Sequence, residues 1–241
     1  MIAASKFIKA SFEEGKRMIG ILREKNLTQV HRTAVKVPIR ALKASHAQQI
    51  AQHLLTLSRE DRYLRFGYSA SDEMIQRYVA GLNFERDEIF GIYNRRLELI
   101  AMAHLAFSVE TDFSSCAEFG VSVLAHARGK GYGSNLFDRA VMHARNEGVE
   151  MMFIHALSEN TAMLNIARKS GAILQRDGAE SDAYLRLLPA DLDSRMTEMF
   201  EEHLAQTDYR LKVQAKQFWD VVRMMQEVRL GVREAKTRTP S

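Results

Sequence analysis

One stretch of the chain, residues 116–148, constrains the fold more than any other. It opens with an apolar, strand-like segment in which Phe119, Val121 and Val123 fall on one side of a period-2 alternation. A loop with three glycines follows, and then apolar residues recur at helical spacing up to a glycine typical of the position after a helix end. The loop reads Arg128-Gly129-Lys130-Gly131-Tyr132-Gly133-Ser134, and the helical pattern consists of Leu136, Phe137, Ala140, Val141 and Ala144, with Gly148 at its end.

A strand, a glycine loop and a helix start in this order form an anion-binding arrangement. The first backbone N–H groups of a helix have no intrahelical partner, and the helix dipole adds partial positive charge there. Glycine lets the backbone approach an anion closely because it has no Cβ. Arg128 and Lys130 add full charges, and Ser134 adds a donor. We therefore expect this loop to bind a phosphate or diphosphate.

The spacing within the loop narrows the choice of phosphate-binding family. It fits neither the Walker loop, Gly-x-x-x-x-Gly-Lys-Ser/Thr, nor the Rossmann fingerprint, Gly-x-Gly-x-x-Gly. The order Arg-x-x-Gly-x-Gly, from Arg128 through Gly131 to Gly133, resembles the coenzyme A diphosphate loop of the GNAT superfamily of N-acetyltransferases. Residues 117–123 are similar to the strand that precedes this loop in the superfamily. Within it, the chain most resembles the bacterial protein-lysine acetyltransferase (Pat-like) branch.

The resemblance covers residues 35–189 and implies an α/β fold with a mixed (α+β) sheet, the GNAT acyl-CoA N-acyltransferase fold. The order of elements that periodicity predicts, β-α-α-β-β-β-α-β-α-β-β, agrees with it. We expect a helical extension over 1–34, the acetyltransferase domain over 35–189 and a second helical extension over 190–241. The predicted strands are 35–41, 87–93, 97–107, 116–123, 151–156, 172–177 and 182–188. The predicted helices are 44–57, 71–82, the helix between the glycine loop and Gly148, 161–170 and one or two within 192–231.

The resemblance also implies a cofactor, acetyl-CoA (coenzyme A), and the residues that hold it. In the family, backbone groups of the strand before the loop pair with the pantetheine arm as an added strand. The amide near Val123 then donates to the thioester oxygen, provided that the strand splays from its neighbour at this point. The expected coenzyme A-binding residues are Val121, Ser122, Val123, Arg128, Gly129, Lys130, Gly131, Tyr132, Gly133, Ser134 and Asn160.

Glu118 is the candidate catalytic residue. A lysine amine has a pKa of about 10.4, so the acceptor needs a base at neutral pH. Glu118 is a carboxylate in an otherwise apolar strand, where partial burial raises a carboxyl pKa, and it stands where the Pat-like branch carries its glutamate. Alternatively, its side chain faces solvent or pairs with an arginine. Tyr63 and Arg65 fall in the region that often lines the acceptor pocket in this fold.

The chain departs from the family pattern at one position. Asn160, Lys169 and Gly171 match the motif Asn-x-x-x-x-x-x-Tyr-x-Lys-x-Gly, but Ala167 occupies the tyrosine position and removes the usual proton donor to sulfur. A thiol pKa of about 8.5 makes the thiolate a fair leaving group, and water or Tyr184 could substitute. The expected function is acetyl transfer from acetyl-CoA to a primary amine, on a protein lysine or a small molecule, by direct attack. The alternative is a catalytically weakened acyl-CoA-binding sensor or regulatory module.

Composition limits the partners. No apolar run reaches the length of a transmembrane helix, no signal peptide is recognisable and there is one cysteine, so we expect a cytoplasmic protein without membrane insertion. No Cys/His/Asp cluster has metal-ligand spacing, so we predict no metal. Residues 1–43 hold ten Lys/Arg against three Glu, and 191–206 hold five acids against one Arg. The basic residues are not interspersed with aromatic residues suited to base stacking. We therefore favour charge pairing between the two ends of the chain over nucleic-acid binding. The terminal helices could instead pair across a homodimer.

Overall fold

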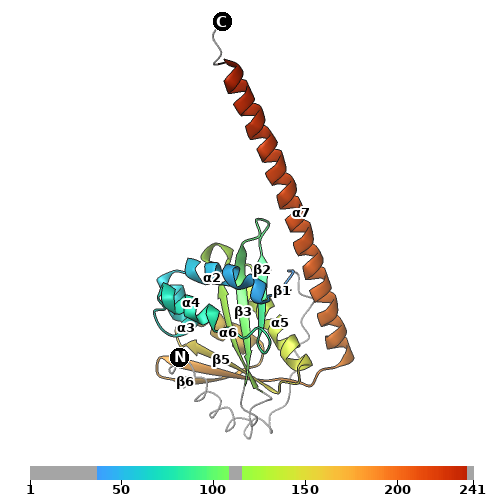
Figure 1. The fold of residues 1–241 in the computed structure, drawn as a ribbon. Helices are drawn as coiled ribbons and strands as arrows, with labels where there is room; N and C mark the ends of the chain where they lie inside the picture. Colours follow the sequence, from blue (N-terminus) through green and yellow to red (C-terminus); the bar gives the residue numbers. More distant parts are fainter. Residues whose placement is uncertain (1–36, 109–115, 238–241) are drawn as a thin grey trace.

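The centre of the molecule is a twisted sheet of seven strands (Figure 1). In the computed structural model, which describes residues 37–108 and 116–237, the strand order is β1-β2-β3-β4-β5-β7-β6. Every neighbouring pair is antiparallel except β4 and β5, which run parallel. The strands are β1 (Arg40–Ala41), β2 (Glu88–Tyr93), β3 (Leu99–Phe107), β4 (Cys116–Val123), β5 (Met151–Leu157), β6 (Ile173–Asp177) and β7 (Glu180–Arg186).

Helices cover both faces of this sheet. Successive side chains of a strand point to opposite faces, so the contacts of β4 assign each helix to a face. Ser122 is hydrogen-bonded to His53 of α2, whereas Phe119 packs edge to face on Phe137 of α5. The helices are α2 (Ala47–Thr56), α3 (Arg59–Phe66), α4 (Asp72–Ala80), α5 (Tyr132–Asn146), α6 (Thr161–Lys169) and α7 (Leu192–Thr237), with 3₁₀ turns η1 (Ala44–His46) and η3 (Ala125–Ala127).

The mixed α/β fold that the resemblance implied is confirmed, and most element boundaries agree with the sequence pattern. Asn160 caps α6 by accepting a hydrogen bond from the Met163 amide, and Gly148 and Gly171 take positive φ just after helix ends. The first strand is an exception. It was expected over 35–41, but β1 is only Arg40–Ala41, since Pro38 has no N–H to donate to a neighbouring strand.

The parallel pair at the centre separates partway along its length. Its register ends with Glu118 opposite Phe153, although β4 continues to Val123 and β5 to Leu157. On its other side, β4 stays paired with β3 up to Val123. The end of β4 therefore presents a backbone edge that β5 does not cover, which is the splay expected at this point.

The C-terminal extension is one helix. α7 runs along the domain and then projects well beyond it (Figure 1). At 1.5 Å per residue its 46 residues span about 69 Å. Within the described residues, no helix combines the length and apolar composition that crossing a bilayer requires. The predicted helical extension over 1–34 lies outside the described residues, and the division into three domains stays a prediction.

Candidate active site

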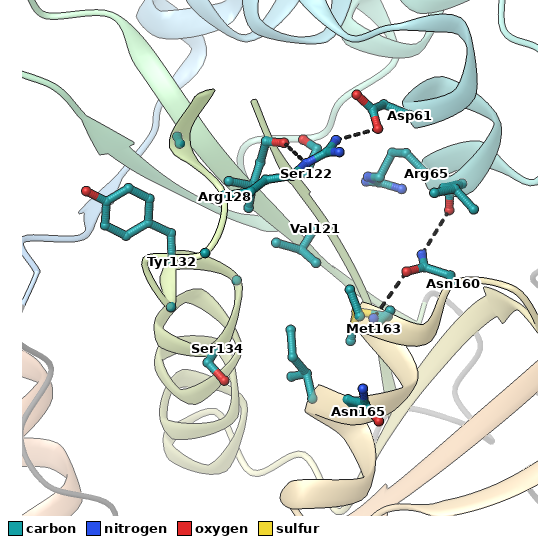
Figure 2. A pocket seen from close by; sticks show the side chains of 18 of the residues that line it. Asp61, Arg65, Val121, Ser122, Arg128, Tyr132, Ser134, Asn160, Met163 and Asn165 are labelled. Atoms are coloured by element: carbon teal, nitrogen blue, oxygen red, sulfur yellow. Dashed lines mark hydrogen bonds and ion pairs between the residues drawn. The ribbon is translucent and has the colours of Figure 1, made fainter. Parts of the chain in front are cut away.

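A cavity of about 410 Å³ lies beside the uncovered end of β4 (Figure 2). Its walls come from α3, the end of β4, the glycine loop, the start of α5, and α6. Every residue predicted to bind coenzyme A lines this cavity except Lys130. The volume is in the usual range for small-molecule sites. Residues far apart in the sequence thus converge on one site large enough for part of a cofactor.

The glycine loop leaves room for an anion at the start of α5. Gly129 and Gly131 have φ of +76° and +78°, in the left-handed region that side chains disfavour. No atom of the described residues outside the adjoining chain lies within 4 Å of where a Cβ would stand on either glycine. Gly131 is the N-cap residue of α5 and contributes no side-chain cap, so the first N–H groups of the helix are not capped by it. This geometry fits a diphosphate.

Gly133 serves a different purpose. A Cβ at this position would lie 3.2 Å from Cδ1 of Ile166 on α6. Because glycine has no Cβ, the first turn of α5 can approach α6 closely. The cavity wall between the two helices depends on that approach.

Arg128 does not present a free charge to the cavity, contrary to the simplest interpretation of the loop. Its Nε donates to the carbonyl oxygen of Val123 at 3.2 Å, and its guanidinium forms an ion pair with Asp61 of α3 (Figure 2). Burial favours a higher pKa for Asp61, but the hydrogen bonds from Arg128 and Ser58 outweigh it and lower that pKa. Arg128 therefore joins the loop to α3 across the cavity.

A buried Ser–His pair, which we did not anticipate from the sequence, lies at the end of β4. The His53 Nδ1 is 2.8 Å from the carbonyl oxygen of Leu99, and its Nε2 is 2.8 Å from the Ser122 hydroxyl. Burial lowers the pKa of His53 to about 4, so the ring is neutral. Since a carbonyl only accepts, Nδ1 carries the proton and Ser122 donates to Nε2. The pair ties α2 to the strand that lines the cavity.

Glu118 lies on the same face of β4 as Ser122, four residues earlier, and does not line the main cavity. It is half-buried and borders a smaller pocket with His155 and Asp182. Burial raises the pKa of Glu118, and the nearby Arg65 partly opposes this increase. His155 and Asp182 are 2.6 Å apart, and that hydrogen bond raises the pKa of His155. A carboxyl group with a raised pKa stands where β4 and β5 begin to separate.

The one side chain suggested as a substitute proton donor, Tyr184, does not line the cavity. It packs with Phe153 and donates to Asp182, while Ala167, at the family's tyrosine position, is fully buried in α6. Asn160 lines the cavity, but its side chain is occupied by the α6 cap and by a 3.4 Å hydrogen bond to the carbonyl oxygen of Leu64. Of the two acceptor-region candidates, Arg65 lines the cavity and Tyr63 does not.

A splayed sheet, a glycine loop opening a helix and a half-buried carboxyl on the splayed strand are the features of a class of acyl-CoA-binding α/β proteins. The model of the acetyltransferase (GNAT) family matches residues 48–172, and the chain belongs to this family. It is therefore an acyltransferase, with acetyl-CoA as the cofactor of its family. A comparison with curated proteins gave no match.

Solved structures share the fold at low identity. The GNAT domain of S. lividans PAT is 19% identical, with a TM-score of 0.53 over 62% of this chain and 89% of that one. A phosphinothricin acetyltransferase from Sinorhizobium meliloti, in complex with acetyl-CoA, is 16% identical, with a TM-score of 0.51 over 64% and 93%. A ribosomal L7/L12 α-N-protein acetyltransferase bound to coenzyme A is 20% identical, with a TM-score of 0.50 over 65% and 98%. At such identities these similarities support the fold alone.

Proposed function

We propose that this protein is an N-acetyltransferase that moves an acetyl group from acetyl-CoA to a primary amine by direct attack. The observation that carries the proposal is the meeting of the splayed end of β4 and the glycine loop around one cavity, next to Glu118. The amine belongs to a protein lysine, as in the Pat-like branch, or to a small molecule.

Bound acetyl-CoA supplies an activated acetyl thioester, and the residues of this chain hold and polarise it. The amides of Gly129, Gly131 and the first turn of α5 would hold the diphosphate, and the uncovered edge from Val121 to Val123 would pair with the pantetheine arm. The Val123 amide would donate to the thioester oxygen. Arg128 and Asp61 fix the loop against α3 so that this geometry is formed before binding.

Glu118 acts as the general base, through an intervening water. A carboxyl group with a raised pKa is a stronger base than an exposed one and can accept a proton from the incoming ammonium. No tyrosine stands at the family's proton-donor position, where Ala167 is buried. The thiolate then leaves unprotonated or takes its proton from water, because its pKa of about 8.5 permits this near neutral pH.

Ala167 also supports the second candidate function, an acyl-CoA-binding sensor with weakened catalysis. Both functions require coenzyme A binding, so turnover separates them. Release of free thiol in the presence of amines supports the transferase. Tight binding without thiol release on any amine supports the sensor.

Thermal stabilisation by ligands tests the cofactor site directly. A ligand at 100 times its Kd stabilises a protein by about 2.7 kcal/mol. We expect stabilisation by acetyl-CoA and coenzyme A and none by ATP. Gly131→Glu places a carboxylate in the anion site and should abolish the effect. Gly178→Glu is the matched control, because Gly178 also has positive φ and open surroundings but lies in the β6–β7 turn. Equal stabilisation of both variants contradicts the loop assignment.

The base is tested by Glu118→Gln. This variant should keep coenzyme A binding and lose turnover, most visibly below pH 8, because amines that deprotonate unaided at higher pH need the base less. The measurement is the pH profile of thiol release. A profile that matches the wild type in shape and height removes Glu118 from the mechanism.

A further inference from the structure

Arg65 reaches from α3 onto the face of β4 that bears the proposed base. Its guanidinium covers Gly120, where a Cβ would lie 2.7 Å from Cζ and from both terminal nitrogens. Gly120 therefore provides the space that Arg65 occupies. Residues two apart in a strand share a face, so the guanidinium lies between the side chains of Glu118 and Ser122. Figure 2 shows Arg65 on the α3 side of the cavity, directed toward β4.

A chain of hydrogen bonds holds Arg65 in place. Its Nη2 donates to the Tyr78 hydroxyl at 3.2 Å, and that hydroxyl is 2.8 Å from Nδ1 of His104. The Nε2 of His104 is 3.2 Å from Asp87, which accepts two further bonds from Arg86. Because an ionised carboxylate only accepts, His104 donates from Nε2 to Asp87. The Tyr78 oxygen accepts from Arg65.

Asp87 ends this series of hydrogen bonds and stays ionised. Burial favours a higher pKa for Asp87, but the hydrogen bonds from His104 and Arg86 lower it to about 2, so the carboxylate stays ionised. The Phe107 amide donates a fourth hydrogen bond at 3.3 Å. Such preorganisation is more than a surface arginine needs, and it reduces the entropy lost when the guanidinium binds a ligand.

Among the described residues Arg65 forms no ion pair, although its charge acts on the nearby Glu118. A guanidinium has five N–H donors, and Tyr78 takes one of those on Arg65. Among the described residues, no carboxylate lies within 4.0 Å of Arg65, whereas its neighbours Arg62 and Arg128 form ion pairs with Asp72 and Asp61. Arg65 lines the cavity. A rigid, half-buried guanidinium with unused donors is the usual protein group for binding a carboxylate bidentately.

We infer that Arg65 binds a carboxylate on the substrate, close to the reacting centre. This inference rests on the proposed function and specifies its substrate class. The carboxylate fits best on the acceptor, because an α-amino acid carries its amine and its carboxylate close together, and Glu118 and the Arg65 guanidinium lie on the same face of β4. The same chemistry would also bind an acyl chain that ends in a carboxylate.

Paired substrates distinguish the two sources of the carboxylate. On the acceptor arm, α-amino acids are compared with the amines formed by removing their carboxyl group, with acetyl-CoA as donor. On the acyl arm, succinyl-CoA is compared with butyryl-CoA. We expect the wild type to prefer the carboxylate-bearing partner on one arm by about 10- to 100-fold in kcat/KM. Arg65→Gln should remove that preference, whereas Arg77→Gln, which deletes an exposed arginine on α4, should retain it.

The same experiment distinguishes failure of the Arg65 inference from failure of the proposed N-acetyltransferase function on which it rests. Coenzyme A binding with no carboxylate preference on either arm overturns the role of Arg65 alone. No coenzyme A binding overturns the proposed function as well. Tyr78→Phe adds a second test, because Tyr78 positions Arg65 without touching the substrate. It should raise KM for the carboxylate-bearing substrate by several-fold and leave KM for the matched amine unchanged, a split that general destabilisation would not produce.

Discussion

The sheet domain and α7 bury opposite kinds of side chain. In the domain, large apolar residues such as Phe119 and Phe137 are fully enclosed between the sheet and its helices. On α7 the polar side chains Glu198 and Glu202 face the domain and contact Arg139, while the large apolar side chains point outward. The exposed set consists of Met196, Met199, Phe200, Leu204 and Leu211. Amphipathic surface helices normally show the reverse pattern.

This difference shows that two kinds of interaction hold the molecule together. The domain is stabilised by apolar burial, which is non-directional and large. The first half of α7 is held by directional contacts around Glu198, whose carboxylate accepts from Arg139 at 2.6 Å and His143 at 2.6 Å, and from Asn146. Arg139 is only 3% exposed. Further along, Tyr209 stacks under the Arg40 guanidinium at 4.0 Å.

The largest effect is expected from truncating a core ring. Phe137→Ala should lower the free energy of unfolding by about 3–5 kcal/mol, because it removes a fully buried aromatic side chain and leaves a cavity beneath β4. The same truncation on α7, Phe200→Ala, should change it by less than about 0.5 kcal/mol, since that ring is 66% exposed. Chemical denaturation measures both. Similar losses for the two variants would contradict the contrast between the regions.

A smaller effect is expected from the polar anchor of α7. Glu198→Gln keeps the shape of the side chain but removes the charge opposite the buried Arg139, which should cost about 2 kcal/mol. The loss should appear mainly as faster amide exchange at the start of α7, because the domain core is untouched. Glu147→Gln, a charge removal at the exposed end of α5, is the control. Unchanged exchange in α7 would mean that these contacts do not hold it.

The same anchor predicts a pH dependence on the order of 1–2 kcal/mol. Burial opposes ionisation of Glu198, but hydrogen bonds from His143 and Asn146 lower its pKa to about 2, so its contribution is lost as pH falls from about 4.3 toward 2. Burial likewise opposes protonation of His143, yet Glu198 raises its pKa. That contribution is complete below about pH 6.5 and is lost as pH rises through the raised value. The contacts of α7 with the domain should be strongest between the lowered pKa of Glu198 and the raised pKa of His143. Amide hydrogen exchange in α7, corrected for its intrinsic pH dependence, measures this.

The features that were predicted correctly from the sequence are those formed by residues close together in the chain. The glycine loop, the Asn160 cap and the helix end at Gly148 are each encoded within a few residues, so the spacing alone locates them. The contacts that it missed join distant positions. His53 and Ser122 are 69 residues apart, and no periodicity relates them. Arg128 was expected to face the phosphate, but its partner Asp61 comes from α3.

The polar side of α7 was missed for a related reason. Periodicity predicts a helix and an apolar stripe but not which side faces the domain. In the structure, Glu198 near the start of α7 meets Arg139 and His143 of α5. The role of a charged residue is fixed by the charge that it meets. That partner becomes known only once the fold brings α5 and α7 together.

The smallest effect on a single chain is expected from the outward face of α7. Leu204→Gln should change the free energy of unfolding by less than about 0.5 kcal/mol, because Leu204 is already exposed to water. The same variant tests the homodimer, which stays a prediction, since two such faces meeting would bury apolar surface that the monomer exposes. Light scattering of the wild type and Leu204→Gln decides between the cases. A dimer that dissociates on substitution assigns this face to self-association, and a monomer in both excludes self-association through it.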